Sequence, residues 1–230
     1  MTSDLDRLRT EYARRRHSAA DRTLYSVFNS SYLFALQQRQ RATLQMLQQH
    51  GITSLGGRQI LEVGCGSGGV LLEYLTYGAQ VSSLMGIDLL PDRLVDGNQR
   101  LPRVSFACAD GQKLPLPSAH FDLILQYTAF SSILDPQIKA NMAGEMLRVL
   151  HPQGCILWYD FWFNPKNPQT QGIRPAEIRT LFPHCRFQFR RVTLAPPIAR
   201  RLVKHSWMLA ILLENLRILN THYLASIWLA

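Results

Sequence analysis

The stretch QILEVGCGSGGVLLEYL, at residues 59–75, changes its pattern twice within a few residues. It begins as a short apolar run, continues through a loop that is glycine at Gly64, Gly66 and Gly68, and then resumes apolar residues at helical spacing from Val70. This pattern predicts a strand, a tight loop and a helix. Backbone N–H groups and the positive end of the helix dipole would then meet at the loop, so we expect it to bind a ligand there.

Strand and helix patterns alternate after this loop. Apolar runs at 83–88, 104–108, 121–125 and 155–161 indicate strands, and helical patterns at 91–99 and 136–150 separate them. Asp135 as N-cap and Pro136 at the first helical position mark the start of the second of these helices. The alternation predicts right-handed βαβ units, a parallel sheet and a doubly wound α/β fold.

Both ends of the chain extend this core. Residues 4 to about 51 have helical spacing, and Gly51 is placed to end that helix. The turn HPQG at 151–154 leads into the fifth strand, and the tail is expected to add strands at 187–193 and 222–228 around a helix from about 198 to 216. We find no linker or internal repeat, so a single domain over residues 1–230 is expected.

Composition restricts the setting of the protein. Lys and Arg outnumber Asp and Glu by 25 to 16, a formal charge of +9, which favours anionic partners. The four cysteines form no C-x-x-C pair, so neither a metal site nor a redox motif is indicated. The first residues do not have the pattern of a signal peptide, and the longest apolar stretch, 207–213, is too short to span a bilayer. We therefore expect a cytoplasmic protein.

Acidic residues follow successive strands and help to identify the ligand. The glycines alone fit NAD as well as S-adenosylmethionine, because Gly64, Gly66 and Gly69 also satisfy G-x-G-x-x-G. Glu62, just before the loop, would repel a pyrophosphate but suits the cationic amino end of a methionine moiety. Asp88, about 20 residues beyond the loop, can accept hydrogen bonds from both ribose hydroxyls.

Together these residues resemble the class I S-adenosylmethionine-dependent methyltransferase family, in its small-molecule branch. The resemblance covers residues 59–161 and includes LHPQG at 150–154, which is similar to the family's Leu-Lys-Pro-Gly-Gly turn. It implies a seven-stranded Rossmann-like sheet with a reversed last strand and added N-terminal helices. It divides the domain into a helical lid at 1–51, a cofactor-binding core at 52–161, and a substrate loop with C-terminal strands and helix at 162–230.

The resemblance also assigns cofactor contacts. Asp88 would bind the ribose, Asp110 and Gly111 would hold the adenine edge, and the backbone of Gln126 would meet the methionine amine. The full set of residues expected to bind S-adenosylmethionine is Glu62, Gly64, Cys65, Gly66, Gly68, Asp88, Leu89, Asp110, Gly111 and Gln126.

A hydroxyl acceptor would need its proton removed. Asp160 ends the fifth strand and His222 starts the last one, so we expect His222 to be the general base, oriented by Asp160, with a rate that rises through an ionisation near pH 6 to 7. The alternative is that His222 is a rim histidine and Asp160 a loop cap. Tyr127 and His17 are reserve candidates.

The acceptor is expected to be a small molecule. The outline is similar to bacterial methyltransferases of glycan and natural-product pathways, which implies O-methylation of a sugar, lipid-linked or natural-product hydroxyl. Arg200, Arg201 and Lys204 near apolar helical positions would suit an anionic or lipid-linked acceptor, or peripheral membrane contact. The alternatives are an RNA methyltransferase or nucleic-acid binder, which the absence of an Asn-Pro-Pro-Tyr-like tetrapeptide and of an RNA-binding motif disfavours, and a nicotinamide-dependent dehydrogenase.

Overall fold

The computed structural model describes residues 4–16, 23–164 and 167–230, and these form one seven-stranded sheet. The strand order is β3-β2-β1-β4-β5-β7-β6, and β7 runs antiparallel to both of its neighbours. This confirms the doubly wound α/β fold with a reversed last strand. The strands are β1 (Ile60–Val63), β2 (Leu84–Asp88), β3 (Ser105–Cys108), β4 (Phe121–Tyr127), β5 (Leu150–Phe161), β6 (Cys185–Leu194) and β7 (Asn220–Leu229).

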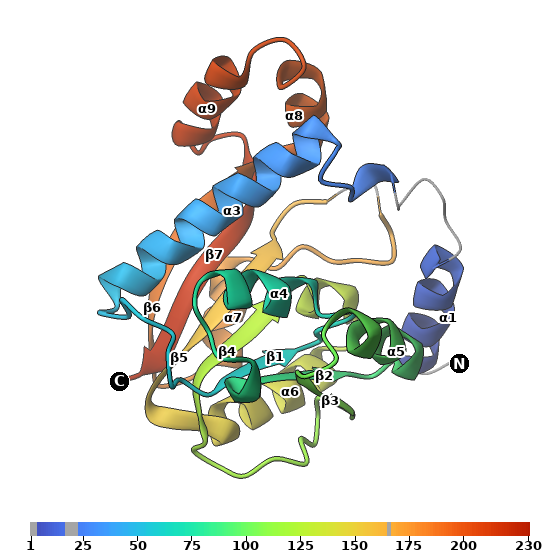
Figure 1. Cartoon of the computed structure of the whole chain (residues 1–230), viewed down its shortest axis with the longest axis vertical. Helices are drawn as coiled ribbons and strands as arrows, with labels where there is room; N and C mark the ends of the chain where they lie inside the picture. The colour runs from blue at the N-terminus through green and yellow to red at the C-terminus, as the bar shows by residue number, and fades with distance from the viewer. Residues whose placement is uncertain (1–3, 17–22, 165–166) are drawn as a thin grey trace.

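Helices cover both faces of the sheet (Figure 1). One face packs against α3, α4 and α5, and the other against α6 and α7, with α1 beside it. The α-helices are α1 (Asp4–Arg16), α3 (Ser30–Gln49), α4 (Gly69–Thr76), α5 (Pro91–Arg100), α6 (Pro136–Val149), α7 (Pro175–Leu181), α8 (Pro196–Leu202) and α9 (Trp207–Asn215). Because both faces are covered, all four residues of β1 are buried, and its sequence is a nearly continuous apolar run.

The N-terminal helical pattern is interrupted in the structure. Asn29 caps α3, because its side-chain oxygen accepts a hydrogen bond from the Ser31 N–H at 3.1 Å. The helical pattern over residues 4–51 is therefore divided between more than one helix, as the expected N-terminal helices require: α1 ends at Arg16 and α3 begins at Ser30. Residues 17–22, including the reserve candidate His17, lie outside the described residues. α3 ends next to Gly51, as expected.

The C-terminal part also differs from expectation. The helix expected over 198–216 is two helices, because Ser206 accepts a hydrogen bond from the Leu209 N–H at 3.2 Å and so caps the start of α9. The short helix α7 was not expected. The turn at 151–154 lies within β5 as an irregularity, where the register against β4 jumps from Leu150 to Cys155. β6 and β7, from residues 162–230, join the same sheet as the strands of 52–161.

A small third core holds α8 and α9 against the rest of the molecule. Ala199, Val203 and Ala210 are buried there with Leu194 of β6. Phe34 of α3 meets Trp207 edge to face, with 5.2 Å between the ring centroids. The two helices therefore rest on the N-terminal half of α3, at one end of the molecule (Figure 1).

The start of α6 gives a test of the local folding rules. Asp135 caps this helix, because its Oδ1 accepts from the N–H of Gln137 at 2.7 Å and of Ile138 at 3.3 Å. Asp135→Ala leaves both donors without that partner and should lower the free energy of unfolding by about 1 kcal/mol in urea titrations. Asp135→Asn keeps an acceptor oxygen and should lose clearly less. Equal stability of the alanine variant and the wild type would contradict this role.

Candidate functional site

The carboxyl ends of the parallel strands bring the expected site residues to one edge of the sheet. β1 to β5 run parallel to one another, so their final residues share that edge. Glu62 is the penultimate residue of β1, Asp88 ends β2, Asp110 follows β3 and Asp160 is the penultimate residue of β5. In open α/β sheets, ligands bind outside this edge.

The glycine loop needs glycine for steric reasons. Gly64 and Gly66 have φ angles of +77° and +53°, in the left-handed region. A Cβ at Gly64 would lie 2.6 Å from the Ala129 Cβ, and one at Gly66 would lie 2.2 Å from Nη2 of Arg93. The loop is therefore packed closely under neighbouring groups, and side chains at these positions would displace them.

The backbone N–H groups of the loop are largely used within the protein. Those of Gly64 and Cys65 donate to the Ile87 carbonyl at 2.8 and 3.0 Å, and that of Gly68 donates to the Cys65 carbonyl at 3.0 Å. The Gly66 N–H donates to a carboxylate oxygen of Asp88 at 2.7 Å. The expectation that the loop presents these N–H groups to a ligand is wrong for these four, because the loop folds back against β2.

Asp88 clamps the loop. One carboxylate oxygen accepts from Gly66 and the other from the Leu90 N–H at 2.9 Å. Each carboxylate oxygen has a second acceptor position, so both of these bonds are compatible with a further bond to a ligand hydroxyl. Leu89, between Asp88 and Leu90, is half-buried.

Glu62 is a buried acid that lacks a partner for one of its oxygens. Its side chain is only 2% exposed, and within the described residues no hydrogen-bond partner reaches Oε2. Burial, with Asp88 and Glu73 nearby, raises the pKa of this carboxyl well above its ordinary value. An orphaned, acidic oxygen at the mouth of the loop fits a cationic group of a ligand.

The remaining cofactor candidates lie around this centre. Asp110 accepts from the backbone N–H of Gln112 at 2.9 Å and so closes a turn after β3. A Cβ at Gly111 would lie 2.8 Å from Cε of Met142, so this position is tightly packed. Cys65 is buried, and burial raises the pKa of its thiol.

Asp160 belongs to a buried polar group on the α6 face. Its Oδ2 accepts from Nε2 of Gln126 at 3.0 Å and from the backbone N–H of Ser131 at 3.0 Å. Burial raises the pKa of Asp160 to about 6. Gln126 is also fully buried, and its Oε1 has no partner among the described residues. Asp160 therefore holds the segment after β4 in place.

The structure does not bring Asp160 and His222 together. His222 is paired with Phe161 across β5 and β7, and neighbouring residues of a strand point to opposite faces, so Asp160 lies on the other side of the sheet. The His222 ring stacks on Tyr159 with 4.8 Å between centroids, and its Nδ1 lies 3.1 Å from Oγ1 of Thr221. Orientation of His222 by Asp160 is therefore ruled out in this structure.

The environment of His222 also changes its titration. Burial lowers its pKa to about 3, and the nearby Arg39 guanidinium adds to this shift. A pKa lowered in this way keeps the imidazole neutral in the physiological range, so we do not expect the rate step near pH 6 to 7 to come from His222.

Arg39 of α3 is a site residue that the sequence did not reveal. Its guanidinium pairs with Glu73 of α4 and lies over the rings of Tyr127 and Tyr159, 5.5 and 5.4 Å from their centroids. Its buried Nε has no partner within the described residues. Nothing in the polar sequence around Arg39 indicates burial, which arises only when α3 packs on the sheet. We name the cluster of Arg39, Tyr127, Tyr159 and His222 the aromatic wall.

Strain marks the end of β4 beside this wall. Thr128 has a φ of +58°, which is rare for a β-branched residue, and its N–H donates to the Tyr159 carbonyl at 2.8 Å. Backbone strain of this kind is concentrated at functional sites.

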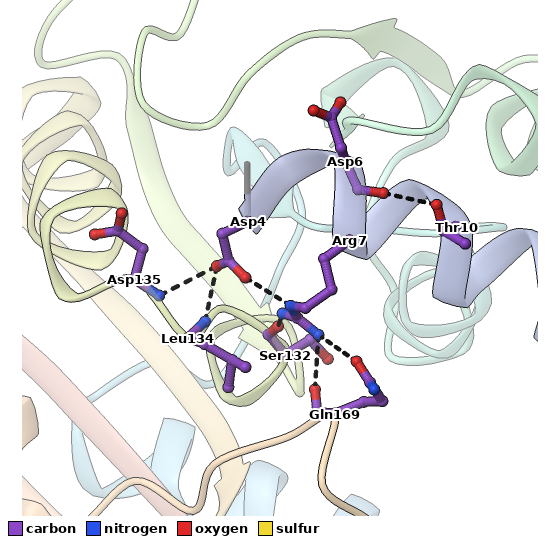
Figure 2. A network of polar contacts seen from close by, with 8 residues as sticks. All are labelled: Asp4, Asp6, Arg7, Thr10, Ser132, Leu134, Asp135 and Gln169. Atoms are coloured by element: carbon purple, nitrogen blue, oxygen red, sulfur yellow. Dashed lines mark hydrogen bonds and ion pairs between the residues drawn. The ribbon is translucent and has the colours of Figure 1, made fainter. Parts of the chain in front are cut away.

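The N-terminal helix α1 is fastened over the same edge of the sheet. Figure 2 shows that Asp4 accepts from the N–H groups of Leu134 and Asp135, while Arg7 donates to the Ser132 carbonyl and to Gln169. The salt bridge between Asp4 and Arg7, with an N–O distance of 2.7 Å, links these two sets of hydrogen bonds.

A second contact places α1 next to the glycine loop. The Arg93 guanidinium that lies against Gly66 is also 4.9 Å from the centroid of the Tyr12 ring of α1. Tyr12 itself forms a hydrogen bond of 3.0 Å with Ser132. Arg93 and Tyr12 therefore cover the loop from outside, and neither was singled out from the sequence.

Two further properties concern the described residues as a whole. No three His, Cys, Asp or Glu side chains among them gather as a possible metal site. No helix within the described ranges combines the length and apolar character that crossing a membrane requires.

Comparisons with known proteins agree with this geometry. Residues 60–154 match a family model described as a methyltransferase domain. Over 108 residues the chain is 37% identical to the phthiotriol/phenolphthiotriol dimycocerosates methyltransferase of Mycobacterium tuberculosis, covering 46% of this chain and 38% of that protein. It is 35% identical over 106 residues to the fatty-acid O-methyltransferase of Mycolicibacterium smegmatis, covering 45% of this chain and 37% of that protein. The chain thus spans about two fifths of the length of these curated relatives.

A solved structure extends the likeness to most of the chain. The geranyl diphosphate C-methyltransferase of Streptomyces coelicolor, in complex with S-adenosylhomocysteine, superposes with a TM-score of 0.58 at 14% sequence identity. The superposition covers 81% of this chain and 76% of that one, which shows a shared fold.

The buried acid of β1 generates a stability prediction. Because the folded state keeps the Glu62 proton to a higher pH than the unfolded chain does, folding stability is lost as the pH rises above the ordinary range of a glutamate. Glu62→Gln cannot ionise, so it should unfold at about the same urea concentration as the wild type near pH 4. It should be more stable by about 1–2 kcal/mol near pH 8.

Asp122→Asn is the matched control. Asp122 lies near the opposite end of the sheet, and its carboxylate accepts from the Gln59 N–H at 2.8 Å. This variant should lose stability at both pH values. A Glu62→Gln variant that is less stable than the wild type near pH 8 would contradict the uncompensated burial of Glu62.

Proposed function

We propose that this protein, whose residues 60–154 match a methyltransferase-domain model, is a class I S-adenosylmethionine-dependent methyltransferase that transfers a methyl group to an oxygen atom of a lipid-like small molecule. The observation that carries the cofactor assignment is the orphaned carboxylate oxygen of Glu62 beside the glycine loop. The observation that favours the acceptor class is the aromatic wall, together with relatives whose names specify lipid substrates.

The residues present fit the cofactor. S-adenosylmethionine, when bound, supplies a methyl group on a positively charged sulfur that leaves as a neutral thioether. Glu62 would bind its ammonium group, Asp88 would accept from the ribose hydroxyls while still clamping the loop, and Asp110 with Gly111 would hold the adenine edge. The Gln126 backbone would complete the methionine end. The floor of the cofactor site would be formed by Gly64, Cys65, Gly66, Gly68 and Leu89.

The same features disfavour a dinucleotide. A pyrophosphate next to Glu62 would meet an acidic group, and the loop donates four of its N–H groups within the protein instead of offering them to phosphate oxygens. A nicotinamide-dependent dehydrogenase is therefore disfavoured, and NAD binding in a binding experiment would reveal it.

The acceptor would lie beside the aromatic wall. The rings of Tyr127, Tyr159 and His222 would give it an apolar environment, and the buried Nε of Arg39 offers a donor to an oxygen atom. Methyl transfer is an in-line displacement, so holding the acceptor oxygen near the methyl carbon and excluding water are the main tasks of these side chains.

His222 would position the acceptor hydroxyl. Its neutral ring can accept a hydrogen bond through Nε2, to which no described residue is hydrogen-bonded. His222 would hold the acceptor hydroxyl at this nitrogen and would relay its proton to water. With a pKa of about 3, His222 is a weak base and acts chiefly through orientation.

A cytoplasmic location is also part of the proposal. All four cysteines are free, and Cys108 is exposed, as a reducing compartment allows.

The activity assay uses S-adenosylmethionine labelled in its methyl group. Long-chain alcohols and phenols, long-chain fatty acids and simple glycans are offered as acceptors, and the product is extracted and identified by mass. We expect labelled methyl ethers or esters of the lipid acceptors. Methylation of RNA alone, or binding of NAD with no binding of S-adenosylhomocysteine, would overturn the proposal.

Replacing His222 tests the acceptor side. His222→Ala should lower kcat by about 10²-fold and leave the cofactor dissociation constant within twofold, because the proposal places this ring against the acceptor and not against the cofactor. Tyr159→Phe is the control, since it keeps the stacked ring and loses only a hydroxyl that bonds Oγ1 of Thr193 at 2.8 Å. It should stay within about threefold of the wild type.

The pH profile of the same reaction separates orientation from ordinary base catalysis. Because the pKa of His222 lies near 3, its ionisation should produce no step in kcat between about pH 5 and 8. A tenfold rise per pH unit near pH 6 to 7 that disappears in His222→Ala would restore the general-base role and contradict the burial argument.

A further inference from the structure

The helix α9 carries an apolar surface that the described part of the chain leaves uncovered. Met208 is 80% exposed, Ile218 72%, Leu212 58% and Leu216 57%. Met208, Leu212 and Leu216 recur at intervals of four residues and therefore lie on one face of α9 and its C-terminal end. We name this surface the apolar ridge: Met208, Leu209, Leu212, Leu216 and Ile218.

The ridge is not needed to hold the helix in place. The opposite side of α9 is buried in the third core through Ala210, and Trp207 meets Phe34 of α3. The start of α9 is fixed by its Ser206 cap. The helix is therefore anchored from within, and α9 lies at one end of the molecule (Figure 1).

Basic residues flank the ridge in the sequence, and the described residues after position 194 include no exposed acid. Arg200, Arg201 and Lys204 precede α9 and Arg217 follows it, and all four are exposed. The one acidic residue after position 194 is Glu214, which is buried on the inner side of α9. The surface thus combines large apolar side chains with a positive rim.

We propose that the apolar ridge docks this protein on the surface of an anionic lipid bilayer. Met208, Leu212 and Ile218 would enter the boundary between headgroups and acyl chains, and the basic rim would meet the lipid phosphates. Charge complementarity favours this occupant over a second copy, because two copies of a chain with a charge of +9 would bring two positive rims together. The inference deepens the proposed function, on which it rests for the lipid nature of the acceptor.

Sedimentation of the full chain with vesicles tests the proposal. The wild type should bind vesicles that contain phosphatidylglycerol, bind pure phosphatidylcholine far more weakly, and be released by high salt. Met208→Ser combined with Leu212→Ser should weaken binding at least about tenfold. Arg200→Gln combined with Arg201→Gln should weaken it about 25-fold, from about fivefold for each charge.

Matched variants at other exposed positions control for composition. Leu72→Ser with Val95→Ser removes two exposed apolar side chains from α4 and α5, and Arg103→Gln with Arg186→Gln removes two exposed charges. Both should bind vesicles as the wild type does. If these controls lose binding as strongly as the ridge variants, the ridge is not the docking surface.

Two further measurements distinguish a failure of the docking proposal from a failure of the proposed function. S-adenosylhomocysteine affinity should be unchanged in the ridge variants, and a wild type that binds this ligand but ignores anionic vesicles would overturn the docking proposal alone. In sedimentation equilibrium, the wild type should show no self-association that depends on Met208. A wild-type dimer that Met208→Ser dissociates would assign the ridge to a second copy instead.

Discussion

The site depends on one electrostatic constraint, the burial of the Glu62 carboxyl group at the end of β1. The strand that carries it is covered on both faces, so the side chain cannot reach water, and Oε2 finds no partner among the described residues. A buried acid without a partner is costly to the fold and is retained where a ligand completes it. The glycine loop follows this residue directly in the chain, and Asp88, which clamps that loop, lies near its carboxyl group.

The cofactor side of the site follows from local sequence because its geometry is local. A strand, three spaced glycines and acids after β2 and β3 appear directly in the sequence, and parallel strands must place their carboxyl ends together. The start of α6 at Asp135 could also be predicted from the sequence, because a cap and a proline act on adjacent residues. The reversed last strand followed from the family resemblance.

The acceptor side was much less predictable, because it is formed by tertiary packing. Arg39 lies in a polar helical segment, and only the contact of α3 with α4 and β5 buries its guanidinium. The pairing of His222 with Phe161 fixed the face on which the histidine lies, and a shift of one residue would have placed it beside Asp160. Sequence spacing placed both residues at the correct edge but could not determine this register. The break between α8 and α9 was missed because apolar residues at helical spacing continue on both sides of Ser206.

The central claim is that Glu62 binds the ammonium group of the cofactor. Calorimetric titration with S-adenosylhomocysteine tests this claim most directly. Since burial raises the pKa of Glu62 in the free protein, binding of a cation should ionise the group and release its proton. Titrations near pH 6.5 in two buffers of different ionisation enthalpy measure that proton. The account predicts release of up to about one proton per site, lost in Glu62→Gln together with at least about tenfold in affinity. Equal affinity and equal proton exchange in the wild type and Glu62→Gln would contradict it.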